Sequence, residues 1–188
     1  ADEVMTGWGR TGTLLACEQA EIEPDILCLS KGLTGGAIPL AVTMASEPVF
    51  DAHRSEDRAQ MFFHSSSYTA NPIACAAANA NLAIWRDEPV MPRIASLGEG
   101  QAVQLNALAT HPAVQNPRQT GTITAFEVGE GSGYLSDLAP RMLALFRERN
   151  VLLRPLGNTI YVMPPYCISS EQLDCIYDTI REVIDDVT

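Results

Sequence analysis

Lysine occurs only once in this sequence, at Lys31, whereas eleven of the twelve basic residues are arginine. An arginine side chain keeps its proton at any accessible pH, but a buried lysine amine can lose its proton and then form a Schiff base with a carbonyl group. Because the sequence uses arginine almost everywhere else, the single lysine indicates a chemical role. The alternative interpretation is a lysine on the solvated surface.

A glycine-rich segment, GWGRTG at residues 7–12, is a second candidate for chemistry. Its spacing matches the GxGxxG pattern of dinucleotide-binding loops, but that pattern is informative only between a strand and a long helix. Here few residues precede it, and Pro24 interrupts the chain soon after it. We therefore favour a plain glycine-rich loop.

Metal ligands are a third possibility, since the chain contains five cysteines and three histidines. They are scattered, with no CxxC pair and no histidines interleaved at metal-ligand spacing, so we predict no metal site. The histidines read as ordinary loop or surface residues. An odd number of scattered cysteines favours a reducing, cytoplasmic compartment.

Lys31 follows an apolar run, DILCLS at residues 25–30, which reads as a buried strand of the parallel kind. Open α/β sheets bind ligands just beyond the carboxyl ends of their strands, and the lysine lies at that place. Glycines in residues 32–36 predict a turn, and residues 38–45 form another apolar segment. The first third of the chain is therefore α/β in character.

Helices account for the middle of the sequence. Asn71 followed by Pro72 predicts a helix start, and the helix should run to about Arg86. Its residues are small nearly all round, which favours close packing on more than one side. A domain boundary is expected near Asp87, and a further helix over residues 92–109.

The last third predicts a small α+β domain. We expect a strand at 121–128, a helix at about 136–149, two short strands at 151–154 and 159–163, and a final helix. That last helix is the clearest element, because its apolar residues recur at i, i+3, i+4 and i+7 between residues 173 and 187. The predicted domains are thus 1–87 and 88–188.

Composition limits the classes of partner. The 188 residues are 46% apolar and 19% charged, enough to bury a core, and no apolar run is long enough to cross a bilayer. The formal charge of -11 repels nucleic acid and anionic membranes, so we expect neither as a partner. The chain opens with neither an initiator Met nor a signal peptide, which we interpret as the start of an internal segment.

Four motifs in one order resemble class III aminotransferases, which are pyridoxal phosphate (PLP) enzymes of fold type I. They are Asp2-Glu3, GWGRTG at 7–12, DILCLSKGLTGG at 25–36 and HSSSYTANPIACAAA at 64–78. The resemblance covers the whole chain but only the C-terminal half of the family's chain. It implies an α/β fold, with part of the large PLP-binding domain at 1–87 and a small α+β domain at 88–188.

The resemblance also implies roles for the cofactor-binding residues. Lys31 would carry PLP and move a proton during transamination, and Asp2 would keep the pyridine nitrogen of PLP protonated. Ser67 matches a hydroxyl residue that reaches the cofactor phosphate of the neighbouring subunit, which implies a homodimer. Ser65 or Ser66 could make that contact instead of Ser67. The alternative interpretation is that the serines contact no phosphate and only precede the helix.

The same resemblance implies a substrate site. Arg154 matches an arginine that holds a substrate carboxylate through a bidentate pair, with a structural salt bridge as the alternative. Tyr161 and Arg10 would line the same pocket, and Gly32 belongs to this substrate-binding set. The substrates would be an amino donor and a keto-acid acceptor.

Within the class, RPLGNTIYVMPPY at residues 154–166 is most similar to members that transfer an amino group from S-adenosylmethionine to 8-amino-7-oxononanoate in biotin biosynthesis. Two alternatives stay open. One is another class III activity, on an ω-amino acid or a diamine. The other is a non-catalytic C-terminal fragment that serves as a dimerisation module.

Overall fold

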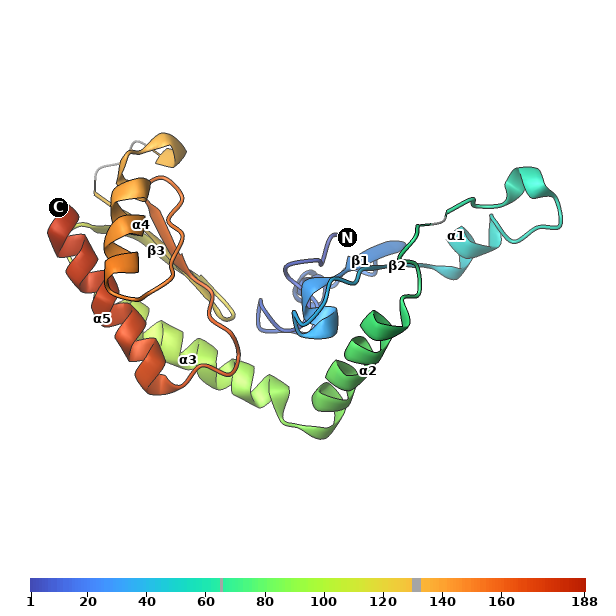
Figure 1. The fold of residues 1–188 in the computed structure, drawn as a ribbon, viewed down its shortest axis with the longest axis horizontal. Helices are drawn as coiled ribbons and strands as arrows, with labels where there is room; N and C mark the ends of the chain where they lie inside the picture. Colours follow the sequence, from blue (N-terminus) through green and yellow to red (C-terminus); the bar gives the residue numbers. More distant parts are fainter. Residues whose placement is uncertain (65, 130–132) are drawn as a thin grey trace. The chain divides into compact units, whose positions relative to one another are not determined.

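Residues 1–64, 66–129 and 133–188 are described by a computed structural model of the chain (Figure 1). Their contacts divide the chain into two units, Ala1–Met91 and Pro92–Thr188. Grouping by contacts does not test whether either part is an independent domain, so the domain limits at Asp87 stay a prediction. In the described ranges, no helix has both the length and the apolar character needed to cross a membrane.

The first unit is built on a small sheet around β1 (Ile26–Leu29), which ends just before Lys31. Its neighbour β2 (Val42–Ala45) runs antiparallel to it, and a single bridge joins Asp2 to Cys28 in the parallel sense. The prediction of a buried parallel strand was therefore wrong in two respects. The main partner of β1 is antiparallel, and only Leu29 within the strand is buried.

Short helical turns connect the elements of the first unit. The chain turns sharply at these points because glycines and prolines interrupt any longer helix. They are η1 (Ala16–Ala20), η2 (Lys31–Thr34), α1 (Glu47–Asp51) and η3 (Arg58–Gln60). Of these, η2 begins at the candidate lysine itself.

Helix α2 (Pro72–Asp87) confirms the sequence prediction almost to the residue. The side-chain oxygen of Asn71 accepts hydrogen bonds from the N–H groups of Ile73 (3.0 Å) and Ala74 (3.3 Å), which caps the helix. The expected packing on more than one side is not found among the described residues. Ala74 and Ala78, one turn apart, are the buried residues of this helix, so the chain covers one face of it.

The second unit contains an antiparallel sheet in the order β3 (Val114–Thr120), β4 (Ile123–Val128) and β5 (Thr159–Val162). Sequence analysis placed β4 and β5 correctly but did not predict β3, whose sequence VQNPRQT is polar and holds a proline. The proline falls where the register shifts between Gln115 and Arg118, since a bulge can accommodate a residue without an N–H group. The strand expected at 151–154 does not form.

Three helices complete this unit: α3 (Val90–Leu108), which starts in the first unit, α4 (Leu138–Glu148) and α5 (Ser170–Val187). The short turn η4 (Gly133–Leu135) precedes α4. Figure 1 shows α4 and α5 side by side, in agreement with the contacts between them. Ser169 begins α5 with a capping box, in which its hydroxyl and the Gln172 side chain each bond the other residue's N–H.

The core of the second unit lies between the sheet and these helices. Phe126, Phe146, Ile160 and Ile180 are fully buried there, and burial of each such side chain contributes about 1.5–3 kcal/mol. This core fixes β5, which carries Tyr161, and the segment before it, which carries Arg154.

Candidate active site

Lys31 lies directly beyond the carboxyl end of β1, as the sequence predicted, and its side chain is exposed. Its backbone has a φ of 41°, in the left-handed region that residues other than glycine rarely adopt. Such a conformation costs on the order of 1–3 kcal/mol and persists only where the surroundings impose it. The neighbours of Lys31 therefore hold it in place.

Gly32 and Trp8 form one side of that support. A Cβ atom built on Gly32 would lie 2.5 Å from the Cβ and 2.6 Å from the Cγ of Trp8, so no larger residue fits without displacing the indole. Trp8 also meets Trp85 edge to face, with ring centroids 5.5 Å apart. The half-buried Gly32 is thus a packing position, and its assignment to substrate binding stays a prediction.

Asp2 lies on the strand-like segment beside β1. The N–H of Glu3 donates to the carbonyl of Cys28 (3.0 Å), and the N–H of Cys28 donates to the carbonyl of Ala1 (2.9 Å). Because these two segments run parallel, their carboxyl ends meet at the same edge of the sheet, which is also the edge where Lys31 lies. One oxygen of the exposed Asp2 carboxylate accepts the N–H of Val4 (3.0 Å), which restricts the side chain.

Glu3 is a residue whose importance the sequence analysis missed. It is 2% exposed, and its carboxylate accepts hydrogen bonds from the Thr6 hydroxyl and from the N–H of Cys17 (2.7 Å). Burial of the Glu3 carboxyl works to raise its pKa, but these donors and the N–H of Ala16 outweigh burial and hold the pKa below its ordinary value. Glu3 therefore ties the loop of residues 4–17 to the edge that carries Asp2.

The glycine-rich loop is not part of a βαβ unit. The N–H of Gly9 donates to the carbonyl of Leu14, the N–H of Gly12 donates to Gly9, and a five-residue 3-10 turn follows. This agrees with a plain loop rather than a dinucleotide-binding one. Arg10 lies half-buried within it.

In the serine-rich segment before α2, Ser66 and Ser67 are exposed. The N–H and hydroxyl of Ser66 lie 3.1 Å and 3.2 Å from the hydroxyl oxygen of Thr69, so Thr69 helps to orient Ser66. The Ser67 side chain is exposed, and Ser65 lies outside the described residues. The assignment of a phosphate contact to one of these serines stays a prediction.

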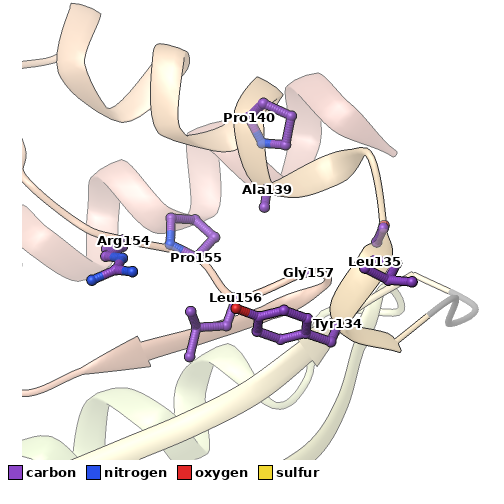
Figure 2. Close-up of a pocket in the computed structure, with 9 residues that line it drawn as sticks. Tyr134, Leu135, Ala139, Pro140, Arg154, Pro155, Leu156 and Gly157 are labelled. Atoms are coloured by element: carbon purple, nitrogen blue, oxygen red, sulfur yellow. The ribbon is translucent and has the colours of Figure 1, made fainter.

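Arg154 lines a hollow of about 320 Å³ in the second unit (Figure 2). The hollow forms because Gly157 allows the chain after Arg154 to press against η4: a Cβ on Gly157 would lie 2.6 Å from the Cα of Tyr134. Its other walls combine polar and apolar surface, from Tyr134, Leu135, Ser136, Ala139, Pro140, Pro155 and Leu156. Within the described parts of the chain the exposed guanidinium makes no ion pair, so the structural salt bridge considered as its alternative role is not found there.

Tyr161 does not line this hollow. It lies on β5 opposite Ala125, and its side chain is half-buried on the face away from Ile160 and Val162. Within the second unit Tyr161 therefore does not share the hollow of Arg154, and the roles of Tyr161 and Arg10 stay predictions.

The residues at the edge of the first unit fit the cofactor that the resemblance implies. PLP needs an amine that can reach its carbonyl carbon and a carboxylate for its pyridine nitrogen. Lys31 and Asp2 supply these groups from adjacent, parallel segments, and the Lys31 amine is not engaged by an ion pair with any residue the structure describes.

Comparison with curated proteins gives consistent relatives. The adenosylmethionine-8-amino-7-oxononanoate aminotransferase of Synechococcus elongatus is 45% identical over all 188 residues, and that of Helicobacter pylori is 38% identical over 99% of the chain. The chain spans 44% and 43% of these two relatives, less than half of their length.

Solved structures support the same grouping. The adenosylmethionine-8-amino-7-oxononanoate aminotransferase of Methanocaldococcus jannaschii superposes with a TM-score of 0.90 at 31% identity, covering 98% of this chain and 44% of the other. An (S)-enantioselective ω-transaminase from Thermomicrobium roseum gives 0.90 at 32% identity, covering 99% and 42%. These neighbours confirm the predicted α/β fold, fold type I of the PLP-dependent transferases.

The model of the aminotransferase class-III family matches residues 1–184, nearly the whole chain. Members of that class depend on PLP in general. The lysine and aspartate at one sheet edge, the fold and this match lead to one conclusion: the chain belongs to the class III aminotransferases.

Proposed function

We propose that the protein transfers an amino group from S-adenosylmethionine to 8-amino-7-oxononanoate, which yields 7,8-diaminononanoate for biotin biosynthesis. The observation that carries the proposal is the placement of the single lysine, Lys31, at the sheet edge beside Asp2. The choice of substrates is supported by relatives named for this reaction, at up to 45% identity.

Bound PLP supplies an electron sink and a carbonyl carbon that accepts amines. Lys31 would hold the cofactor through its Nζ atom, and its free amine would accept the proton from the carbon that bears the donor's amino group. The Asp2 carboxylate would hold a proton on the pyridine nitrogen, and the N–H of Val4 donates to this carboxylate and restricts its side chain.

Arg154 binds the carboxylate of the acceptor through its two parallel N–H groups, and the apolar residues among those that line its hollow, such as Leu135 and Leu156, cover the adjoining hydrocarbon chain. Tyr161, Arg10 and Gly32 complete the substrate site in this proposal. A hydroxyl from Ser67, or from its neighbour Ser66, binds the cofactor phosphate of a second subunit.

Because the serine hydroxyl serves the cofactor of a second subunit, the functional unit in this proposal is a homodimer. We place it in the cytoplasm. The five cysteines are free thiols, which supports a reducing compartment. Sedimentation of the full-length natural protein at assay concentration tests the dimer, and an active monomer would contradict it.

A donor and acceptor assay tests the reaction itself. The full-length natural protein, loaded with PLP, should convert 8-amino-7-oxononanoate with S-adenosylmethionine as the donor and should use diamines and ω-amino acids poorly. The same protein without S-adenosylmethionine is the control. No turnover with this pair would contradict the proposed substrates.

An activity on ω-amino acids or diamines is the second candidate. The ω-transaminase from Thermomicrobium roseum resembles this chain as closely in structure as the Methanocaldococcus jannaschii enzyme does. A kcat/KM for a diamine or ω-amino acid above that for S-adenosylmethionine would favour this candidate, with the roles of Lys31 and Asp2 unchanged.

A further inference from the structure

The backbone at Lys31 is strained, and the residues around it must impose this conformation. Lys31 has a φ of 41° and is followed by Gly32. Hydrogen bonds within the turn, from Leu33 to Ser30 (2.9 Å) and from Gly36 to Lys31 (3.1 Å), describe its shape. The Ser30 hydroxyl, which donates to the Leu40 carbonyl (2.6 Å), and the buried side chains of Leu33 and Thr34 also fix the turn. A further contact connects the turn to helix α2.

Asn81, in the middle of α2, makes that connection. Its side-chain nitrogen donates to the carbonyl of Gly32 (2.9 Å) and to the carbonyl of Leu33 (3.2 Å). These carbonyls belong to the first turn after the lysine, 48 and 49 residues away in sequence. The half-buried amide thus joins a capped, rigid helix to the peptide groups that follow Lys31.

The Asn81 amide lies close to a second glycine of the turn, Gly35. A Cβ on Gly35 would lie 3.2 Å from the amide oxygen of Asn81, so a side chain there would crowd it, and Gly35 itself has a φ of 62°. Trp8 fills the space beside Gly32. The turn is therefore in contact with both an indole and an amide.

We propose that Asn81 is a positioning residue for Lys31: its two hydrogen bonds hold the turn so that the lysine amine stays where the cofactor needs it. This rests on the proposed function, in which Lys31 carries PLP. Without the amide the turn loses one of its supports, so Lys31 can relax toward ordinary φ values and the long side chain moves its amine away. A misplacement of about 1 Å is enough to reduce turnover on the order of 100-fold.

A merely structural role predicts something different. If Asn81 only stabilised the fold, replacing it would lower thermal stability and leave the properties of the bound cofactor unchanged. A moved amine instead meets different charges, so the pH at which the visible absorbance of bound PLP changes would move with it.

The test uses the full-length natural protein loaded with PLP. Asn81→Leu keeps the size of the side chain but removes both donors, whereas Asn81→Gln keeps a donor at a greater reach. Asn79→Leu is the matched control, since Asn79 is an exposed asparagine on the same helix. Each variant is measured for kcat, KM, thermal midpoint and the pH midpoint of the cofactor absorbance.

For Asn81→Leu we expect kcat to fall about 10- to 100-fold with KM for both substrates within about twofold of the wild type. The pH midpoint should shift by roughly half a unit or more, the sign depending on where the amine moves. Asn81→Gln should recover part of kcat and of the midpoint, and Asn79→Leu should match the wild type.

Two results overturn the proposal: a wild-type kcat in Asn81→Leu, or a lower kcat with an unchanged pH midpoint. Should Asn81→Leu not fold, Asn81→Ser, which keeps one short donor, decides by the same two measurements. Lys31→Ala separates this from the proposed function. If Lys31→Ala still turns over and binds PLP normally, the proposed function is wrong. If Lys31→Ala is inactive but Asn81→Leu behaves like the wild type, only the proposed role of Asn81 is wrong.

Discussion

Replacing Glu3 by glutamine tests whether a buried carboxylate holds the loop of residues 4–17 to the sheet. Glutamine has the same shape, but it offers one acceptor oxygen, and its NH₂ group would face the donors that now point at the carboxylate. Those donors include the Thr6 hydroxyl and the N–H of Cys17 at 2.7 Å. The variant therefore loses the negative charge that strengthens these bonds, and the Thr6 hydroxyl has to accept from the new NH₂ group instead of donating.

The magnitude follows from the kind of hydrogen bond. A bond to a charged group contributes about 1.5–3 kcal/mol, and about 1.4 kcal/mol is a factor of ten in an equilibrium. The loop should therefore open roughly 10- to 100-fold more often in Glu3→Gln at about pH 7.

Hydrogen exchange of the peptides that cover residues 4–17 measures this opening. The ratio of the variant's rate to the wild type's, taken at one pH, cancels the intrinsic chemical rate. Since the folded pKa of Glu3 is lowered, its stabilising effect is complete above the unfolded pKa of about 4.3 and is lost as pH falls through the lower folded pKa. The ratio should thus be constant near neutral pH and approach one in acid.

Glu23→Gln is the matched control, because Glu23 is an exposed glutamate in the same unit. Its exchange over residues 4–17 should equal that of the wild type. The reasoning about Glu3 is refuted if Glu3→Gln exchanges like the wild type at neutral pH, or if the ratio grows as the solution becomes more acidic.

Three further outcomes are expected. Arg154→Ala should weaken acceptor binding by roughly 2–4 kcal/mol while PLP binding stays normal. An acceptor with an amide in place of its carboxylate should bind the wild type and Arg154→Ala about equally. An unchanged acceptor KM in Arg154→Ala would exclude Arg154 from the substrate site. Gly32→Ala should destabilise the first unit by about 1–3 kcal/mol, because its Cβ meets Trp8; a wild-type urea midpoint would contradict this. The buried Tyr177 hydroxyl donates to the Gln101 amide oxygen (2.5 Å), and burial raises the pKa of Tyr177 to about 12. Tyr177 should therefore form no tyrosinate below about pH 11, and its titration at a lower pH would contradict this burial.

Local signals in the sequence were enough to predict several elements. The cap formed by Asn71 with Pro72 predicted the start of α2, and the recurrence of apolar residues predicted α5, because both signals act within a few residues. Strand β3 lacks any such signal: VQNPRQT is polar, and it forms a strand only because β4 lies beside it. The opposite error occurred at residues 151–154, which form no strand: Leu153 is buried in the core, whereas Leu152 is 81% exposed.

The candidate site divides in the same way. Residue type and motif were sufficient to select Lys31 and Asp2, and the structure brings their segments together at one edge. Glu3 and Asn81 were not predicted, because their hydrogen bonds reach 14 and 49 residues along the chain and leave no local pattern. The sequence shows Asp2 and Glu3 only as two neighbouring acids. It does not indicate that Glu3 is buried and Asp2 is exposed.

Covalent trapping of the cofactor tests the central claim most directly. The full-length natural protein is incubated with PLP, reduced with borohydride and digested, and the peptides are mapped by mass spectrometry. We expect the reduced cofactor to be attached to Lys31 in the wild type, and Lys31→Ala and Lys31→Arg to carry no label, since arginine offers no free amine. A label elsewhere in the wild type, or none on a protein that still transaminates, would contradict it.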